Sequence, residues 1–194
     1  MKHRTSNYHG ENLRCLLWRE EVARDGWARQ LEDWLGCYPP RAEDLLTGTK
    51  PLSEGEARRI AEKCPSVDAE SLIMTRLLDS WKINVLQANI SHLIECLSEP
   101  GRGGKAKLAK ALGVDPGTIS HWLAGRQGVR RQHQTRLKEI AGVPPGTDLA
   151  TDPLFLELMP PSTSAQRLWL RERAAQVPED RIRRLFPALY DLLK

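Results

Sequence analysis

The sequence predicts an all-α protein that contains a duplicated helical unit. Apolar residues recur at intervals of three and four along most of the chain, which is the spacing of one face of an α-helix. Glycine and proline residues stand between these stretches, at positions where helices begin or end. Residues 12–72, moved by 77 positions, also align without a gap with residues 89–149. The identical pairs include Asn12 and Asn89, Leu16 and Leu93, Leu31 and Leu108, Leu35 and Leu112, Gly36 and Gly113, Pro39 and Pro116, Gly48 and Gly125, and Leu72 and Leu149.

Four short helices are expected in the second copy. Glycine or proline separates them, because glycine closes a helix in a left-handed conformation and proline fits its first turn. Asp115 is a good N-cap, and Pro116 follows it at the first position of the third helix. The apolar residues of the four helices are Ile90, Leu93, Ile94 and Leu97, then Leu108, Ala109 and Leu112, then Ile119, Trp122 and Leu123, and finally Leu137 and Ile140.

The regions outside the two copies are also expected to be helical. A connecting helix is predicted between the copies, with an apolar side that packs the two units together. The repeat ends after residue 150, and two helices are expected beyond it, from Ser164 to about Gln176 and from Glu179 onward, the second broken by Pro187. The apolar residues crowded near the end of the chain complete the core or form a dimer seam. The predicted organisation is unit one at 10–67, a connecting helix at 68–86, unit two at 87–149 and a C-terminal helical segment at 150–194.

Composition limits the classes of protein to which the chain belongs. It is 40% hydrophobic and 28% charged, which is ordinary for a soluble protein with a core. No apolar run approaches the roughly 20 residues that a bilayer span requires. The polar N-terminus has no secretory signal, so a cytoplasmic protein is expected. The four cysteines stand too far apart for the paired ligands of a structural zinc site and are expected to be reduced: Cys15, Cys37, Cys64 and Cys96.

No catalytic motif is recognisable, and the chain is expected to be non-enzymatic. It has no phosphate-cradling glycine loop, and no Ser-His-Asp or Cys-His set stands in a known context. His92 and Cys96 lie one helical turn apart, which is a possible spacing for two metal ligands. On an apolar helix we interpret them as core or boundary residues, so neither a metal nor a cofactor is expected.

One further pattern lies between Lys105 and Gly125 and consists of Leu108-Ala109, Leu112-Gly113-Val114, Ile119, Trp122 and Gly125. In these residues the segment resembles the lambda-repressor-like (XRE-type) helix-turn-helix. With its flanking helices, the resemblance covers residues 89–149. It implies a compact bundle of about five helices that acts as a dimer on operator DNA.

The third helix of unit two is the predicted DNA-reading helix. Ile119 and Trp122 are expected in the core, which leaves an outward face that is small enough at its N-terminal end to enter a major groove. The predicted base-reading residues are Pro116, Gly117, Thr118, Ser120 and His121. The resemblance further implies phosphate contacts from the start of the preceding helix and from the loop after the reading helix. The residues there are Lys105, where the family often has glutamine, Lys107, Arg126, Gln127, Arg130 and Arg131.

Unit one departs from this pattern. Arg41, Glu43 and Asp44 stand at its groove-facing positions, where two carboxylates would face phosphates. Residues 87–142 carry a net charge of +5, whereas residues 10–65 carry −2. Because phosphate neutralisation dominates affinity for DNA, unit two is predicted to bind duplex DNA and unit one to be a partner-binding or dimerising copy.

The expected function is a sequence-specific, double-stranded DNA-binding transcriptional regulator, a repressor that works as a homodimer. One alternative is an antitoxin or adaptor that binds a protein partner through residues 10–67 or 150–194. Another is an RNA-binding regulator, because a basic face alone does not distinguish types of duplex.

Overall fold

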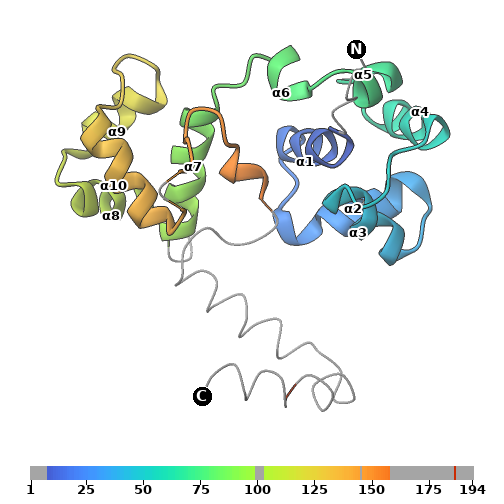
Figure 1. Ribbon diagram of the computed structural model, residues 1–194, viewed down its shortest axis with the longest axis horizontal. Coiled ribbons are helices and arrows are strands. Elements are labelled where there is room, and N and C mark those ends of the chain that lie inside the picture. The colour runs from blue at the N-terminus through green and yellow to red at the C-terminus, as the bar shows by residue number, and fades with distance from the viewer. Residues whose placement is uncertain (1–7, 99–102, 145, 158–185, 187–194) are drawn as a thin grey trace. The chain divides into compact units, whose positions relative to one another are not determined.

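The computed structural model describes residues 8–98, 103–144, 146–157 and 186, and every regular element among them is helical (Figure 1). The all-α prediction is therefore confirmed. The described residues divide into two compact units, the first formed by residues 8–88 with 150–157 and the second by the described residues of 89–149. Within the described residues, no helix is both long and apolar enough to cross a bilayer.

Unit 1 is a helical bundle arranged around its first helix. That helix, α1, contacts α3, α5, α6 and the short helix η2. Its inward residues Leu13, Leu16 and Leu17 are fully buried, as is Trp27 at the start of α2. The elements of unit 1 are α1 (His9–Arg19), η1 (Arg24–Gly26), α2 (Trp27–Leu35), α3 (Pro39–Thr47), α4 (Glu54–Lys63), α5 (Ala69–Met74), α6 (Leu77–Ser80) and η2 (Leu154–Leu156).

The predicted connecting helix at 68–86 is wrong, because a buried asparagine holds the backbone open between α5 and α6. Asn12 is fully buried, and its Nδ2 donates hydrogen bonds to the carbonyl oxygens of Leu72 and Thr75 over 2.9 and 2.7 Å. The backbone N–H of Leu77 donates to Asn12 Oδ1 over 2.9 Å. Thr75 is extended, with φ −119° and ψ 140°, so the helix ends there and a new turn begins at Leu77. These three bonds replace the helical ones that would otherwise be needed.

The segment that follows the second copy contributes to the core of unit 1. Phe155 is fully buried, and its ring centroid lies 4.6 Å from that of Trp18 on α1. Arg24 donates hydrogen bonds to the backbone carbonyl oxygens of Phe155 and Glu157. The first residues of the predicted C-terminal segment therefore form part of a core. The helices expected from residue 164 onward, and the proposed dimer seam, lie outside the described residues apart from Phe186.

Unit 2 repeats the helix pattern of unit 1. Its helices are α7 (Val85–Leu97), which begins in unit 1, α8 (Gly104–Leu112), α9 (Pro116–Leu123) and α10 (Arg131–Ala141). Moved by 77 positions, α2 coincides with α8, and α3 and α4 coincide with α9 and α10 to within one residue. Asn89 Nδ2 donates to the carbonyl oxygen of Leu149 over 2.9 Å, which is the counterpart of the bond from Asn12 to Leu72. The sequence repeat thus extends to a buried side-chain hydrogen bond.

Candidate nucleic-acid interface

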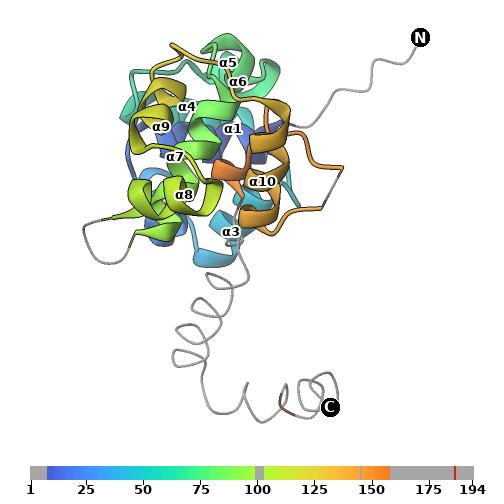
Figure 2. The same cartoon turned by 90° about the vertical axis from the view of Figure 1, so that its left-hand side faces the viewer.

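A tight turn joins α8 to α9, and α8 lies beside both α9 and α10 (Figures 1 and 2). Gly113 takes a left-handed conformation with φ +67°, which an L side chain rarely adopts, and so ends α8. The Asp115 carboxylate accepts a hydrogen bond from the N–H of Gly117 over 2.6 Å and caps α9. Ile119 and Trp122 are 0% and 2% exposed, so they anchor α9 in the core of the unit.

The base-reading residues predicted on α9 all keep some access to solvent. Pro116 and His121 are exposed, whereas Gly117, Thr118 and Ser120 are half-buried. The residues predicted to contact phosphates are all exposed: Lys105, Lys107, Arg126, Gln127, Arg130 and Arg131. The accessibility that DNA contact requires is therefore present at each position.

A hydrogen bond ties the start of α8 to α9. Lys105 Nζ donates to Ser120 Oγ over 3.1 Å, and the same hydroxyl donates to the carbonyl oxygen of Pro116 over 3.2 Å. The single hydroxyl proton of Ser120 is thus used within α9, and one of its lone pairs accepts from Lys105. Ser120 holds the ammonium group of Lys105 against the exposed face of α9, a pairing that the sequence alone does not indicate.

A polar pocket of about 230 Å³ opens beside the N-terminal end of α9. It brings Thr118 together with Gln127 and Arg130 from the loop after α9. It also includes His133 on α10, whose ring centroid lies 5.4 Å from that of Trp122. The sequence alone does not indicate His133 as a site residue, because nothing in its residue type or spacing marks it. The pocket is lined by Val114, Asp115, Thr118, Trp122, Gln127, Arg130 and His133.

Unit 1 holds an internal ion pair at the equivalent place. The Arg41 guanidinium binds the Glu56 carboxylate through Nε to Oε1 over 2.8 Å and Nη2 to Oε2 over 2.6 Å. Arg41 Nη2 also donates to the carbonyl oxygen of Pro51 over 3.0 Å. Hydrogen bonding from Arg41, supported by Ser53, lowers the pKa of Glu56 from 4.5 to about 2. The only cation at the groove-facing positions of α3 is therefore paired within the unit itself.

Several other cations of unit 1 are also engaged within it. Arg14 donates to the carbonyl oxygen of Leu46, and burial lowers the pKa of its guanidinium. Arg59 Nη1 donates to the carbonyl oxygen of Leu35 over 2.9 Å. Lys50 pairs with Asp44 of α3. These contacts engage the three side chains within unit 1.

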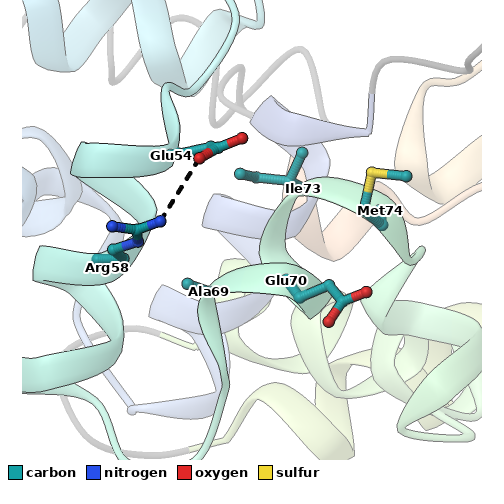
Figure 3. A pocket seen from close by; sticks show the side chains of 6 residues that line it. All are labelled: Glu54, Arg58, Ala69, Glu70, Ile73 and Met74. Carbon is teal, nitrogen blue, oxygen red and sulfur yellow. Dashed lines mark ion pairs between the residues drawn. The ribbon is translucent and has the colours of Figure 1, made fainter.

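Unit 1 has instead an apolar pocket of about 280 Å³ between α4 and α5 (Figure 3). Glu54 and Arg58 form an ion pair of 3.6 Å on the α4 side, as the dashed line in Figure 3 shows. Ile73 and Met74 line the α5 side, and Met74 is 70% exposed. Within the described part of the chain, the only cation that lines this pocket is Arg58, which is paired with Glu54. The pocket is therefore poorly suited to binding a phosphate.

Within the described residues, no group of three or more histidine, cysteine or carboxylate side chains is placed to hold a metal ion. All four cysteines are free thiols. Burial raises the pKa of Cys15 to about 12 and that of Cys64 to about 11, which keeps both thiols protonated and unreactive. His92 is 6% exposed, and its Nε2 lies 3.4 Å from Cys96 Sγ on the same helix.

Comparison of the chain with protein-family models, with curated proteins and with solved structures finds no match. Its function is therefore inferred from the residues and geometry of the two units.

Proposed function

We propose that the chain is a sequence-specific regulator that binds duplex DNA through unit 2. In this proposal each unit is a helix-turn-helix bundle of the lambda-repressor type, and α9 is the helix that enters the major groove. The observation that carries the proposal is the difference between the two copies. The outward face of α9 has neutral residues, most of them small, with cations on either side. On the equivalent face of α3, Arg41 and Asp44 are held in ion pairs within unit 1.

The electrostatics of unit 2 favour a polyanionic partner. Arg126, Arg130 and Arg131 are exposed around the loop that follows α9, and Lys105 is held near Ser120 at the other side of that helix. Cations on both sides of a groove-sized helix can contact phosphates on the two walls of a major groove. Such contacts release counterions, which makes binding strong and dependent on salt.

The test is fluorescence anisotropy of the full-length chain on selected and scrambled duplexes across a salt series. His121→Ala removes a side chain assigned to base edges, so it should weaken binding to the selected duplex by about 1–3 kcal/mol and relax the base preference. Arg126→Ala should weaken binding to every duplex and reduce the salt slope by about one unit. If both variants bound selected and scrambled duplexes like the wild type, α9 would not be the reading helix.

A matched control lies on the equivalent face of unit 1. Glu43→Ala with Asp44→Ala removes two carboxylates from α3, and DNA affinity should stay the same or rise slightly because repulsion falls. Loss of binding in this double variant, with normal binding by His121→Ala, would assign DNA to unit 1. Competition with an RNA duplex of the same sequence tests the alternative of RNA binding, which predicts that RNA displaces DNA efficiently.

We further propose that the regulator is a homodimeric repressor. A two-fold symmetric dimer requires inverted half-sites whose centres lie one helical turn or a multiple of it apart. The selected duplexes should show this symmetry, and light scattering should give the mass of two chains. A monomer at micromolar concentration, with and without DNA, would reject this part of the proposal.

A further inference from the structure

The pocket beside α9 lies at the position in unit 2 that corresponds to the Arg41–Glu56 ion pair of unit 1. Moved by 77 positions, Arg41 and Glu56 correspond to Thr118 and His133. In unit 1 the guanidinium and carboxylate bind each other in a two-point ion pair whose side chains are 27% and 15% exposed. Threonine is short and uncharged, so it cannot form that pair, and unit 2 has a pocket of about 230 Å³ there.

The pocket offers hydrogen-bond donors of several kinds. Thr118 supplies a hydroxyl, Gln127 an amide and His133 an imidazole, while Arg130 adds a guanidinium with five N–H donors. Arg130 is exposed, and none of the ion pairs within the described residues involves it. A planar guanidinium beside neutral donors matches the geometry of a phosphate oxygen pair.

One carboxylate in the lining of this pocket would repel an anion. Asp115 lies in the lining, where it accepts the hydrogen bond from the N–H of Gly117 that caps α9. Its negative charge offsets that of Arg130, so a free anion should bind weakly. A phosphate that belongs to a duplex is held by other contacts at the same time, and this raises its effective concentration at the pocket.

We infer that this pocket seats one phosphate group, supplied by the DNA backbone at the edge of the groove that α9 enters. The inference rests on the proposed function and extends it. It makes Thr118 a phosphate ligand instead of a base reader, and it adds His133 to the interface. The Arg41–Glu56 ion pair then explains why unit 1 has no equivalent phosphate-binding pocket.

The experiment transfers the ion pair of unit 1 into unit 2. Thr118→Arg with His133→Glu leaves the formal net charge unchanged, and unit 1 shows that this pair forms at the equivalent positions. The double variant should bind all duplexes about 3- to 10-fold more weakly, with a salt slope lower by about one unit, because one phosphate contact is lost. The reciprocal variant, Arg41→Thr with Glu56→His, removes the ion pair of unit 1 and should leave DNA affinity unchanged. Circular dichroism and thermal unfolding check that both variants fold.

A second measurement uses inorganic phosphate as the probe and needs no DNA. Titration into the full chain should shift the side-chain NMR signals of Arg130 and His133 in the wild type. In the double variant, which has glutamate at position 133, the Arg130 signal should not shift. Arg130→Gln, a milder change, should abolish the shift of the His133 signal. If the double variant bound DNA with unchanged affinity and salt slope, the phosphate seat would be rejected while the proposed function stood.

The phosphate site can also hold while the proposed function fails. If the wild type bound no duplex but phosphate shifted the Arg130 and His133 signals, the pocket would be a site for a free phosphate and DNA binding would be rejected. If neither duplex binding nor phosphate shifts were found, both conclusions would fail.

Discussion

The Asn12 side chain gives a sharp test of what holds unit 1 together. Asn12→Ala removes one donor group and one acceptor that serve three backbone groups at distances of 2.7 to 2.9 Å; two of these bonds are buried and the one to Thr75 is partly buried. An ordinary hydrogen bond contributes about 0.5–1.5 kcal/mol net, and a buried group left without a partner costs about 1–3 kcal/mol. At about 1 kcal/mol for each bond, the free energy of unfolding should fall by about 3 kcal/mol. That is a large part of the 5–15 kcal/mol that is typical of a domain.

The assay is urea unfolding followed by circular dichroism, together with hydrogen exchange of the segment between α5 and α6. The Leu77 amide should lose protection in Asn12→Ala, because Asn12 Oδ1 is its acceptor. Ser66→Ala is the matched control in the same unit, since it removes one exposed hydrogen bond to Glu20 and should change stability by less than about 0.5 kcal/mol. A loss below about 1 kcal/mol in Asn12→Ala, with Leu77 still protected, would refute the argument that these bonds hold the turn.

Two further predictions concern packing in unit 2 and charge in unit 1. A Cβ at Gly104 would lie 2.0 Å from the backbone oxygen of Ile94, so Gly104→Ala should destabilise unit 2 by about 3 kcal/mol. The control is Gly128→Ala, whose added Cβ would meet no atom within 4 Å and should change the melting temperature of unit 2 little. The pKa of Glu56 is about 2 in the folded chain and near the ordinary value of 4.5 when unfolded. The stabilisation by Glu56 is therefore present above pH 4.5 and lost as pH falls toward 2, which should cost about 1–3 kcal/mol. Urea unfolding across this range should show a shallower pH dependence in Glu56→Gln, and an unchanged profile would contradict the assignment.

The difference between the copies lies in the chemistry of a few surface positions, because the helices themselves are nearly the same. The change from Arg41 and Glu56 to Thr118 and His133 exchanges an internal ion pair for a pocket. Such an exchange leaves the buried leucines of either bundle unaffected. It therefore allows two copies to keep one fold while one has an ion pair and the other a polar pocket at the same place.

The sequence by itself determined the all-α class, the helices of both copies and the turn between α8 and α9. These features depend on local signals, such as apolar residues at helical spacing, Pro116 behind an N-cap and Gly113 at a left-handed position. The positions on α9 that keep access to solvent also followed from the sequence, because its buried residues lie at helical spacing.

Only the tertiary structure decided features that depend on residues far apart in the chain. Asn12 breaks the helix expected at 68–86 through bonds to backbone groups at least 60 residues away, which helical periodicity does not record. Phe155 packs against α1 across a still longer separation. The pocket beside α9 needs His133, whose place opposite Thr118 is set by how α10 packs. Local propensity fixes which residues form helices, whereas contacts between distant residues decide where a helix is interrupted and which side chains meet.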